Sequence, residues 1–182
     1  VQIIKTDPYG SKEWSRGYGG KKDDYGWAVT ESFDNGFVIA GETFSFGRGQ
    51  NDIYVIKLDS LGNKIWDNSF GGLAQEVGYA ISKHDDGGYL IVGQTKSYGK
   101  GSSDGIILKI NSKGQKEWEK YYGGKGLDYF NSILKDDKNN YLITGSSRSS
   151  TEGGSQAWIV NIDTDGYIIW ENTYGNTGDN AS

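Results

Sequence analysis

The distribution of apolar and polar residues predicts short β-strands in groups of four. In one stretch, four runs rich in β-branched and aromatic residues occupy residues 25–32, 36–43, 52–59 and 64–72. Runs of this length and composition, bounded by Gly, Asn, Asp or Ser, favour strands over helices. The same pattern follows twice more along the chain. We therefore expect an all-β protein.

Tight turns are predicted where the runs meet. Residues 34–36 (Asp-Asn-Gly) and 86–88 (Asp-Gly-Gly) separate the first and second runs of two groups, and Gly62, Gly114 and Gly166 separate the third and fourth runs. Asn and Gly adopt the positive φ angles that tight hairpin turns require. The first two strands and the last two strands of each group are therefore expected to form antiparallel hairpins.

The four-run group repeats at a constant interval of 52 residues. A tryptophan in the fourth run and a glycine in the second hairpin share this interval in every copy, and further glycines do so at the end of the fourth run and in the second run. The repeated positions are Trp14, Trp66, Trp118 and Trp170; Gly10, Gly62, Gly114 and Gly166; Gly20, Gly72 and Gly124; and Gly41, Gly93 and Gly145. A fixed period over so many positions indicates a repeat architecture.

The composition supports this interpretation and excludes other classes. The 182 residues include 29 Gly and 1 Pro, together with 6 Trp, 13 Tyr and 6 Phe. An interior Gly costs a helix about 1 kcal/mol, so a helical bundle is excluded. Although only 35% of the residues are hydrophobic, the aromatic rings supply enough apolar surface for a folded core.

Charge and missing residue types restrict the chemistry. The formal net charge of −5 opposes binding to nucleic-acid phosphates, and no apolar run approaches the roughly 18 residues of a membrane-spanning helix. Cys is absent, which excludes disulfides and thiolate chemistry, and Met is absent as well, so we expect a processed or excised piece of a longer chain. The one histidine, His84, interrupts the repeat and is expected at the surface of a hairpin turn.

Four antiparallel strands in a repeat of this length are typical of a β-propeller blade. We predict a single propeller segment over residues 1–182 with 14 strands, or three and a half blades. Its parts are an outer half-blade at 1–20, blades at 21–72, 73–124 and 125–176, and the start of another repeat at 177–182. The repeated tryptophans are expected to pack between neighbouring blades, because each blade must cover the face of the next.

Residues 72–114 carry a longer motif that includes DGGYLIVGQTKSYGKGSSD at residues 86–104. This motif resembles the bacterial and archaeal extracellular propeller repeats of the SBBP and delta-60 type, and the resemblance extends over essentially the whole chain. It implies a propeller fold and an extracellular location, and little about activity. Kelch repeats are the second choice. They end the second strand with Gly-Gly, whereas here a single Gly precedes Glu42, Gln94 or Ser146.

The loops between the second and third strands are the predicted ligand-binding elements, because they share one propeller face with the connections between blades. Phe46 and Tyr98 occupy equivalent positions in these loops, as do Arg48 and Lys100, with Glu152 in the third unit. An exposed ring can stack on a pyranose while a charged group and Ser hydroxyls hydrogen-bond to it. The alternative is a Gly-Ser turn whose rings pack on the adjacent blade.

Acidic residues near the start of each blade are candidate metal ligands. Asp24, Glu76 and Asp128 lie at equivalent positions, where they could surround a channel and hold Ca²⁺, which needs six or more oxygen ligands. The alternative is that they are solvated or cap loop amides. Asp52 and Asp104 begin the third strands and are expected to cap loop amides. No other cofactor is predicted.

No spacing singles out a catalytic pair of residues. We therefore expect a non-enzymatic scaffold, secreted or displayed at the cell surface, that presents loops to a glycan or a surface protein. Two alternatives stay open. The chain is a fragment of a secreted polysaccharide-active enzyme with its catalytic residues on other blades, or it is a structural subunit that assembles through open blade edges, with the remaining blades of a longer chain or with other copies of itself.

Overall fold

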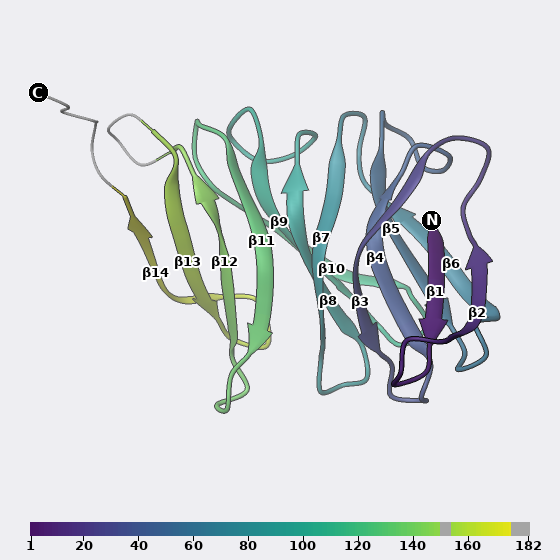
Figure 1. Cartoon of the computed structure of the whole chain (residues 1–182). Helices are drawn as coiled ribbons and strands as arrows, with labels where there is room; N and C mark the ends of the chain where they lie inside the picture. Colours follow the sequence, from purple (N-terminus) through teal and green to yellow (C-terminus); the bar gives the residue numbers. More distant parts are fainter. Residues whose placement is uncertain (150–153, 176–182) are drawn as a thin grey trace, which may run out of the picture.

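The computed structural model describes residues 1–149 and 154–175, and these residues form fourteen β-strands in four antiparallel sheets (Figure 1). The two-stranded sheet consists of β1 (Gln2–Thr6) and β2 (Lys12–Gly17). The first four-stranded sheet consists of β3 (Asp24–Glu31), β4 (Phe37–Thr43), β5 (Asp52–Leu58) and β6 (Lys64–Phe70). The second consists of β7 (Glu76–Lys83), β8 (Tyr89–Thr95), β9 (Asp104–Ile110) and β10 (Lys116–Tyr122). The third consists of β11 (Asp128–Lys135), β12 (Tyr141–Ser147), β13 (Gln156–Ile162) and β14 (Ile168–Tyr174).

The all-β prediction and the four-strand repeat are confirmed. In each four-stranded sheet the strands are paired in chain order, so every connection within a sheet is to the neighbouring strand. The hairpin turns have the expected backbone: φ is 62° at Asn35, 87° at Gly87 and 78° at Gly62. These positive angles are the reason that Asn and Gly recur at these positions.

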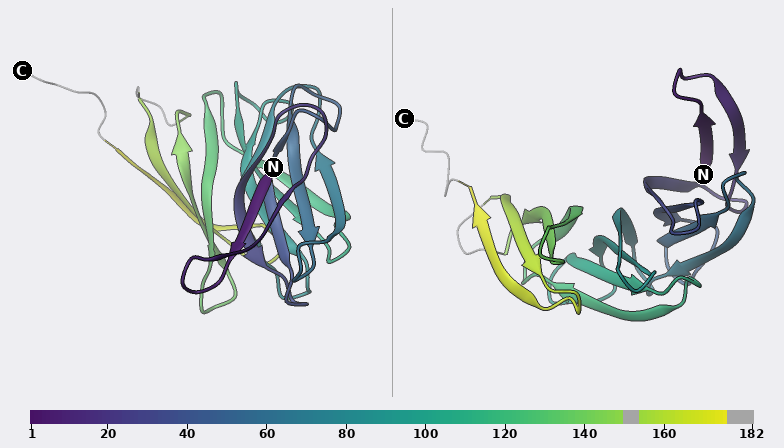
Figure 2. Two further views of the ribbon diagram at one scale, coloured as in Figure 1. Left: turned by 45° about the vertical axis from the view of Figure 1, so that its right-hand side comes forward. Right: turned by 90° about the horizontal axis from the view of Figure 1, so that it is seen from below.

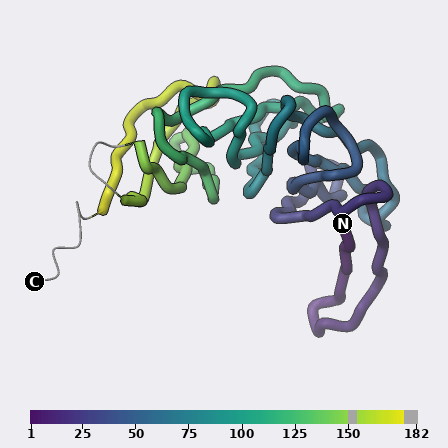
Figure 3. The backbone as a smooth tube through the Cα atoms, turned by 90° about the horizontal axis from the view of Figure 1, so that it is seen from above, coloured from purple at the N-terminus to yellow at the C-terminus, as the bar shows by residue number. Residues whose placement is uncertain are grey.

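The sheets follow one another around an arc (Figures 2 and 3). The first strand of each sheet contacts the first strand of the next, since β7 contacts β3 and β11 contacts β7. The last strands, β6, β10 and β14, lie along the convex side (Figure 2). The sheets therefore fan about an axis instead of stacking linearly, and the arc that the described residues form is open.

Apolar side chains fill the space between neighbouring sheets. Val38, Ala40 and Val55 of the first sheet form one cluster with Tyr89 and Ile91 of the second sheet. A corresponding cluster joins the second and third sheets. All seven residues of β5 and all seven of β9 are buried, because both faces of these strands are covered. Each sheet thus depends on its neighbours for its core.

The repeated tryptophans pack against the next sheet, as predicted. A Cβ atom added to Gly114 would lie 2.8 Å from the indole of Trp66, and one added to Gly166 would lie 2.7 Å from Trp118. Each indole therefore rests on the turn between the third and fourth strands of the following sheet, where only Gly leaves room. No described sheet follows that of Trp170, which is 43% exposed.

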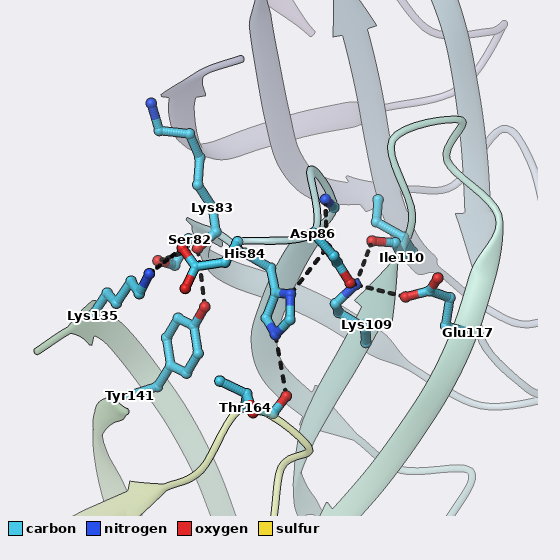
Figure 4. Close-up of polar contacts among 12 residues, drawn as sticks. Ser82, Lys83, His84, Asp86, Lys109, Ile110, Glu117, Lys135, Tyr141 and Thr164 are labelled. Atoms are coloured by element: carbon cyan, nitrogen blue, oxygen red, sulfur yellow. Dashed lines mark hydrogen bonds and ion pairs between the residues drawn. The ribbon is translucent and has the colours of Figure 1, made fainter. Parts of the chain in front are cut away.

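The prediction that His84 is a surface residue is wrong. Its side chain is only 11% exposed, and its ring stacks on Tyr141 with the ring centroids 5.9 Å apart (Figure 4). Nδ1 lies 2.9 Å from a carboxylate oxygen of Asp86, and Nε2 lies 3.2 Å from the carbonyl oxygen of Thr164 in the third sheet. The turn is covered because the curvature of the arc brings the third sheet against it.

A buried lysine lies beside this histidine (Figure 4). The side chain of Lys109 is 1% exposed, and its Nζ lies 2.7 Å from Asp86 and 2.6 Å from Glu117. The ammonium also donates to the carbonyl oxygen of Ile110 at 3.4 Å. A buried ammonium requires such partners, since desolvation of an unpaired charge is costly.

Candidate binding face

The two ends of the strands are built differently. At the "loop end", at the top of Figure 1, lie the loops between second and third strands and the connections between sheets. At the "turn end" lie the hairpin turns. The loop end comprises residues 18–23, 44–51, 71–75, 96–103, 123–127 and the described part of 148–155. The turn end comprises residues 7–11, 32–36, 59–63, 84–88, 111–115, 136–140 and 163–167.

Buried carboxylates at the start of the third strands fix the loops of the loop end. Oδ2 of Asp52 accepts hydrogen bonds from the backbone N–H groups of Arg48 and Gly49 at 3.1 and 3.2 Å. Oδ2 of Asp104 accepts from Lys100 and Gly101 at 3.0 Å in both cases. Asp52 and Asp104 are each 1% exposed. The prediction that they cap loop amides is confirmed.

The candidate metal ligands hold the connections between sheets. Glu76 accepts hydrogen bonds from the N–H of Gly72 at 2.7 Å, the hydroxyl of Thr95 at 2.9 Å and the N–H of Ser97 at 3.1 Å. It therefore ties a connection to the loop of its own sheet.

Asp24 and Asp128 make equivalent contacts, each accepting from a backbone N–H at 2.8 Å, that of Gly20 and of Gly124 respectively. Among the described residues, no three His, Asp or Glu side chains are grouped to hold a metal ion. These contacts support the capping alternative, and a Ca²⁺ site at Asp24, Glu76 and Asp128 stays a prediction.

The hydrogen bonds also set the pKa values of these acids. At Asp128, burial raises the pKa, but donation from the hydroxyls of Ser147 and Ser149 and from loop amides outweighs burial, and the pKa is lowered. At Asp52, burial raises the pKa, the two loop N–H groups lower it, and the nearby charge of Glu76 raises it, so the net shift is upward. The two pKa values shift in opposite directions because Asp128 accepts hydrogen bonds from hydroxyl groups in addition to backbone N–H groups, whereas Asp52 accepts from backbone N–H groups.

The two predicted ligand-binding rings are partly packed and partly exposed. The ring of Phe46 lies with its centroid 5.6 Å from that of Tyr54, and Tyr98 stacks on Tyr121 at 5.1 Å. Phe46 is 42% exposed and Tyr98 is 41% exposed. Each ring packs against a neighbouring tyrosine and still presents surface to solvent. The arrangement therefore combines the two sequence interpretations, a packed ring and an exposed ring.

Glycine allows Tyr98 to take this position. A Cβ atom at Gly72 would lie 2.4 Å from Cβ of Ser97 and 3.1 Å from the Tyr98 ring. Any side chain at residue 72 would therefore displace the loop. Gly20 and Gly124 occupy the same position, where a Cβ atom would lie 2.5 Å from Cβ of Ser45 and 2.7 Å from Cβ of Ser149.

A groove of about 550 Å³ crosses the loop end between the first and second sheets. Its lining includes Arg48 from one loop, Tyr98 and Lys96 from the next, and the connection of residues 71–74 between them. The structure thus brings together Arg48 and Tyr98 from separate repeats. Phe46 and Lys100 belong to the same end of the molecule and do not line this groove.

Sequence reasoning missed two residues that line the groove. Lys96 is exposed, and its Nζ donates to Oε1 of Gln75 at 2.6 Å. Leu73 is 82% exposed although it is apolar. The repeat alignment contained a signal for both, because Arg148 occupies the position of Lys96 in the third sheet, and Leu73 replaces the lysines found at Lys21 and Lys125.

A second aromatic surface lies on the first strands of the sheets. Each of β3, β7 and β11 contains a bulge, which leaves Trp27, Tyr79 and Asn131 without a strand partner. Trp27 is 53% exposed, its ring centroid is 6.4 Å from that of Tyr79, and its Nε1 donates to Glu42 at 3.3 Å. The bulges repeat with the 52-residue period, but the positions of apolar residues and turns along the sequence did not predict them.

A scan against protein-family models finds no match for this sequence, and a search of curated proteins finds no similar one. In the part of the chain that the structure describes, no helix is long and apolar enough to span a membrane.

Proposed function

We propose that the arc is part of a β-propeller that is secreted or displayed at the cell surface. Three observations support the propeller: sheets of one length that repeat every 52 residues, first strands that contact one another along the arc, and indoles that pack on the next sheet. The extracellular location is supported by the resemblance to SBBP and delta-60 type repeats.

We propose further that the protein is a non-enzymatic binding module and that its loop end binds glycans. The groove that joins Arg48 and Tyr98 carries this proposal. Loops are the usual position for binding residues on a rigid scaffold, and buried Asp52 and Glu76 hold these loops in one conformation. Because the loops are already ordered, binding need not include the free energy of ordering them.

The chemistry of the groove suits a sugar. Tyr98 presents a half-exposed ring whose position is fixed by Tyr121, and such a ring can pack against the apolar face of a pyranose. Arg48 supplies up to five N–H donors in a planar arrangement. A ring and a multiple donor that line one groove can hold a polyhydroxylated ligand by stacking and by hydrogen bonds.

The proposal is tested with a glycan array and the variant Tyr98→Ala. We expect the chain to bind at least one glycan and Tyr98→Ala to lose about five- to thirtyfold in affinity, since stacking on an aromatic residue and ring burial contribute on the order of 1–2 kcal/mol. Tyr9→Ala is the matched control, because Tyr9 is 92% exposed at the turn end. Absence of binding on a broad array, or equal loss in the two variants, would contradict the proposal.

A second candidate function, assembly through the end sheets, is favoured by their exposed apolar residues. Ile4 in β1 is 57% exposed, whereas its repeat equivalent Ile56 is 1% exposed. A groove of about 440 Å³ lies between β1 and β3 and is lined by Val1, Ile3 and Trp27 among others. Assembly predicts concentration-dependent sedimentation that Ile4→Asp abolishes; a monomer at all concentrations would contradict it.

A further inference from the structure

The charges at the loop end differ in sign from those of the whole chain. This end carries seven exposed basic side chains and a single exposed acid, Asp23, among the described residues. The basic residues are Lys21, Lys22, Arg48, Lys96, Lys100, Lys125 and Arg148. The chain as a whole has a net charge of −5, so the exposed side chains of this end are mainly basic although the chain is acidic.

These seven cations are not paired with any carboxylate of the described residues. The lysines that do form ion pairs lie at the turn end or within strands, as Lys57 does with Asp34, Lys109 with Asp86 and Lys135 with Asp85. None of the seven loop-end cations lies within ion-pairing distance of a carboxylate in residues 1–149 and 154–175. Their charge is thus available to a ligand.

The acids of the loop end lie beneath this surface. Asp52, Glu76, Asp104 and Asp128 are at most 1% exposed, and their oxygens accept hydrogen bonds from loop N–H and hydroxyl groups. These buried acids reduce the positive electrostatic potential of the face, but they form no ion pairs with the seven exposed cations. A ligand that approaches from solvent therefore meets the cations first, and the attraction should weaken with salt.

We propose that the ligand of the loop end is an acidic polysaccharide, a polymer of uronic acid residues. This inference rests on the proposed glycan function and names the class of glycan. Arg48 is exposed and lines the same groove as Tyr98. Arg binds a carboxylate with two parallel N–H donors, while the neighbouring ring packs against a sugar.

The repeat extends this arrangement along the arc. Lys100 has the position of Arg48 one repeat further, and it lies with Lys125 and Arg148 at the next junction, between the second and third sheets. A polymer that lies across successive junctions therefore meets one or a few cations at each of them. A polyuronate carries one carboxylate per sugar and suits such a series of sites.

A nucleic acid fits this surface less well. Double-stranded DNA carries one negative charge per about 1.7 Å of helix axis, and proteins that bind it place many cations along it. Here the cations are spread over several loops, with buried carboxylates beneath them and a negative net charge overall. Widely spaced cations next to half-exposed rings suit a polymer with a lower charge density than DNA.

The test compares polygalacturonate with the same polymer after methyl esterification, which removes the charge and keeps the sugar backbone. Binding is measured by calorimetry without divalent cations, at about 50 mM and about 200 mM salt. We expect polygalacturonate to bind at least about tenfold more tightly than the ester at the lower salt concentration, and the difference to shrink at the higher one.

Two charge variants and a control locate the site. Arg48→Gln and Lys100→Gln should each weaken binding of polygalacturonate by about three- to tenfold, since a hydrogen bond to a charged group is lost. Lys113→Gln makes the same change of net charge at the turn end, where Lys113 is exposed, and should leave binding unchanged. An equal loss in all three variants would show that only net charge matters and would overturn the proposal.

The outcomes separate this inference from the function on which it rests. If the methyl ester binds as tightly as the acid and Tyr98→Ala abolishes both, the glycan function stands and the acidic ligand is wrong. If neither polymer binds and no glycan on the array binds, both are wrong. If single-stranded DNA binds more tightly than polygalacturonate and depends on Arg48 equally, the ligand class is wrong.

Discussion

The loop end and the turn end of the strands use charged residues in opposite ways. Next to the turn end, Lys57 and Lys109 near the ends of β5 and β9 are buried and paired with acids of the turns, Asp34 and Asp86. At the loop end, the acids that begin the strands are buried and bind backbone amides, and the cations are exposed without an ion pair to any described carboxylate. Charge at the turn end therefore holds the fold together, whereas charge at the loop end is left for a ligand.

The different connections explain this contrast. A short hairpin turn satisfies its own backbone, as when Oδ1 of Asp59 accepts from the N–H groups of Leu61 and Asn63. The longer loops and the connections between sheets cannot do so, and a buried N–H without a partner is costly. Five acids of the loop end supply that partner, so they cannot also neutralise its lysines and arginines.

The largest expected effect is at the loop end. Glu76→Ala removes the acceptor of three donors, those of Gly72, Thr95 and Ser97, and should lower the free energy of unfolding by about 3 kcal/mol or more. Glu76→Asp is the control, because Asp occupies this position in the other two sheets, and it should cost about 1 kcal/mol. Urea denaturation measures both. Equal urea midpoints for Glu76→Ala and wild type would show that the hydrogen bonds of Glu76 do not stabilise the loop end.

The next effect concerns packing against the turn end of the neighbouring sheet. Trp66→Ala removes an indole that rests on Gly114, and we expect a loss of about 2 kcal/mol, below the range for a fully buried ring. Trp170→Ala removes an indole that none of the described sheets covers and should cost less than about 1 kcal/mol. The pair is measured by thermal unfolding. If Trp170→Ala is as destabilising as Trp66→Ala, the tryptophans act within their own sheets.

A smaller effect is the acid sensitivity of the turn end. The hydrogen bond from Lys57 lowers the pKa of Asp34 to about 2, with help from Ser32 and against burial. At Asp86, burial raises the pKa, but donation from Lys109 and its neighbours lowers it to about 2. Folding therefore depresses both values below the ordinary 3.8.

Their contribution to stability is then complete above about pH 4 and is lost as the pH falls towards 2. Because both side chains are about half-exposed, the contribution should be about 1 kcal/mol or less. The double variant Asp34→Asn/Asp86→Asn should show a smaller drop in melting temperature between pH 4 and pH 2 than wild type. An unchanged drop would mean that other acids, such as those of the loop end, determine acid unfolding.

The smallest effect tests whether the loop-end cations are free. Arg48→Gln and Lys100→Gln should change the free energy of unfolding by less than about 0.5 kcal/mol, because neither side chain is buried or ion-paired. Urea denaturation of each variant checks this. A large loss of stability would show that these side chains support the loops. Weaker binding of polygalacturonate by the same variants would then reflect a disturbed loop structure.

The fold was largely predictable because its information is local and repeated. The strands, the turns at Asn35 and Gly62 and the packing role of the tryptophans follow from residue type and a constant period. The burial of His84 was not predictable, since it depends on Thr164, which is 80 residues away in the chain and belongs to another sheet. The bulges at Trp27 and Tyr79 were missed because nothing in the residue pattern distinguishes them.

Part of the arrangement at the loop end followed from the sequence. The capping role of Asp52 and Asp104 was predicted from the start of a strand after a loop, and Phe46, Arg48, Tyr98 and Lys100 were proposed as binding residues from their equivalent positions. The sequence did not predict which of these residues line the same groove. Arg48 and Tyr98 line one groove because loops of successive sheets meet there, and Phe46 lies outside it.

By itself the sequence determined the strands, their turns and the 52-residue period, since these depend on the backbone preferences of neighbouring residues and on the alternation of side chains. Only the tertiary structure decided which charges are buried and which are free. Burial depends on the sheet that covers a residue, and an acid such as Glu76 and a lysine such as Lys100 look equally hydrophilic in sequence. The packing of one sheet on the next puts the first inside and leaves the second on the surface.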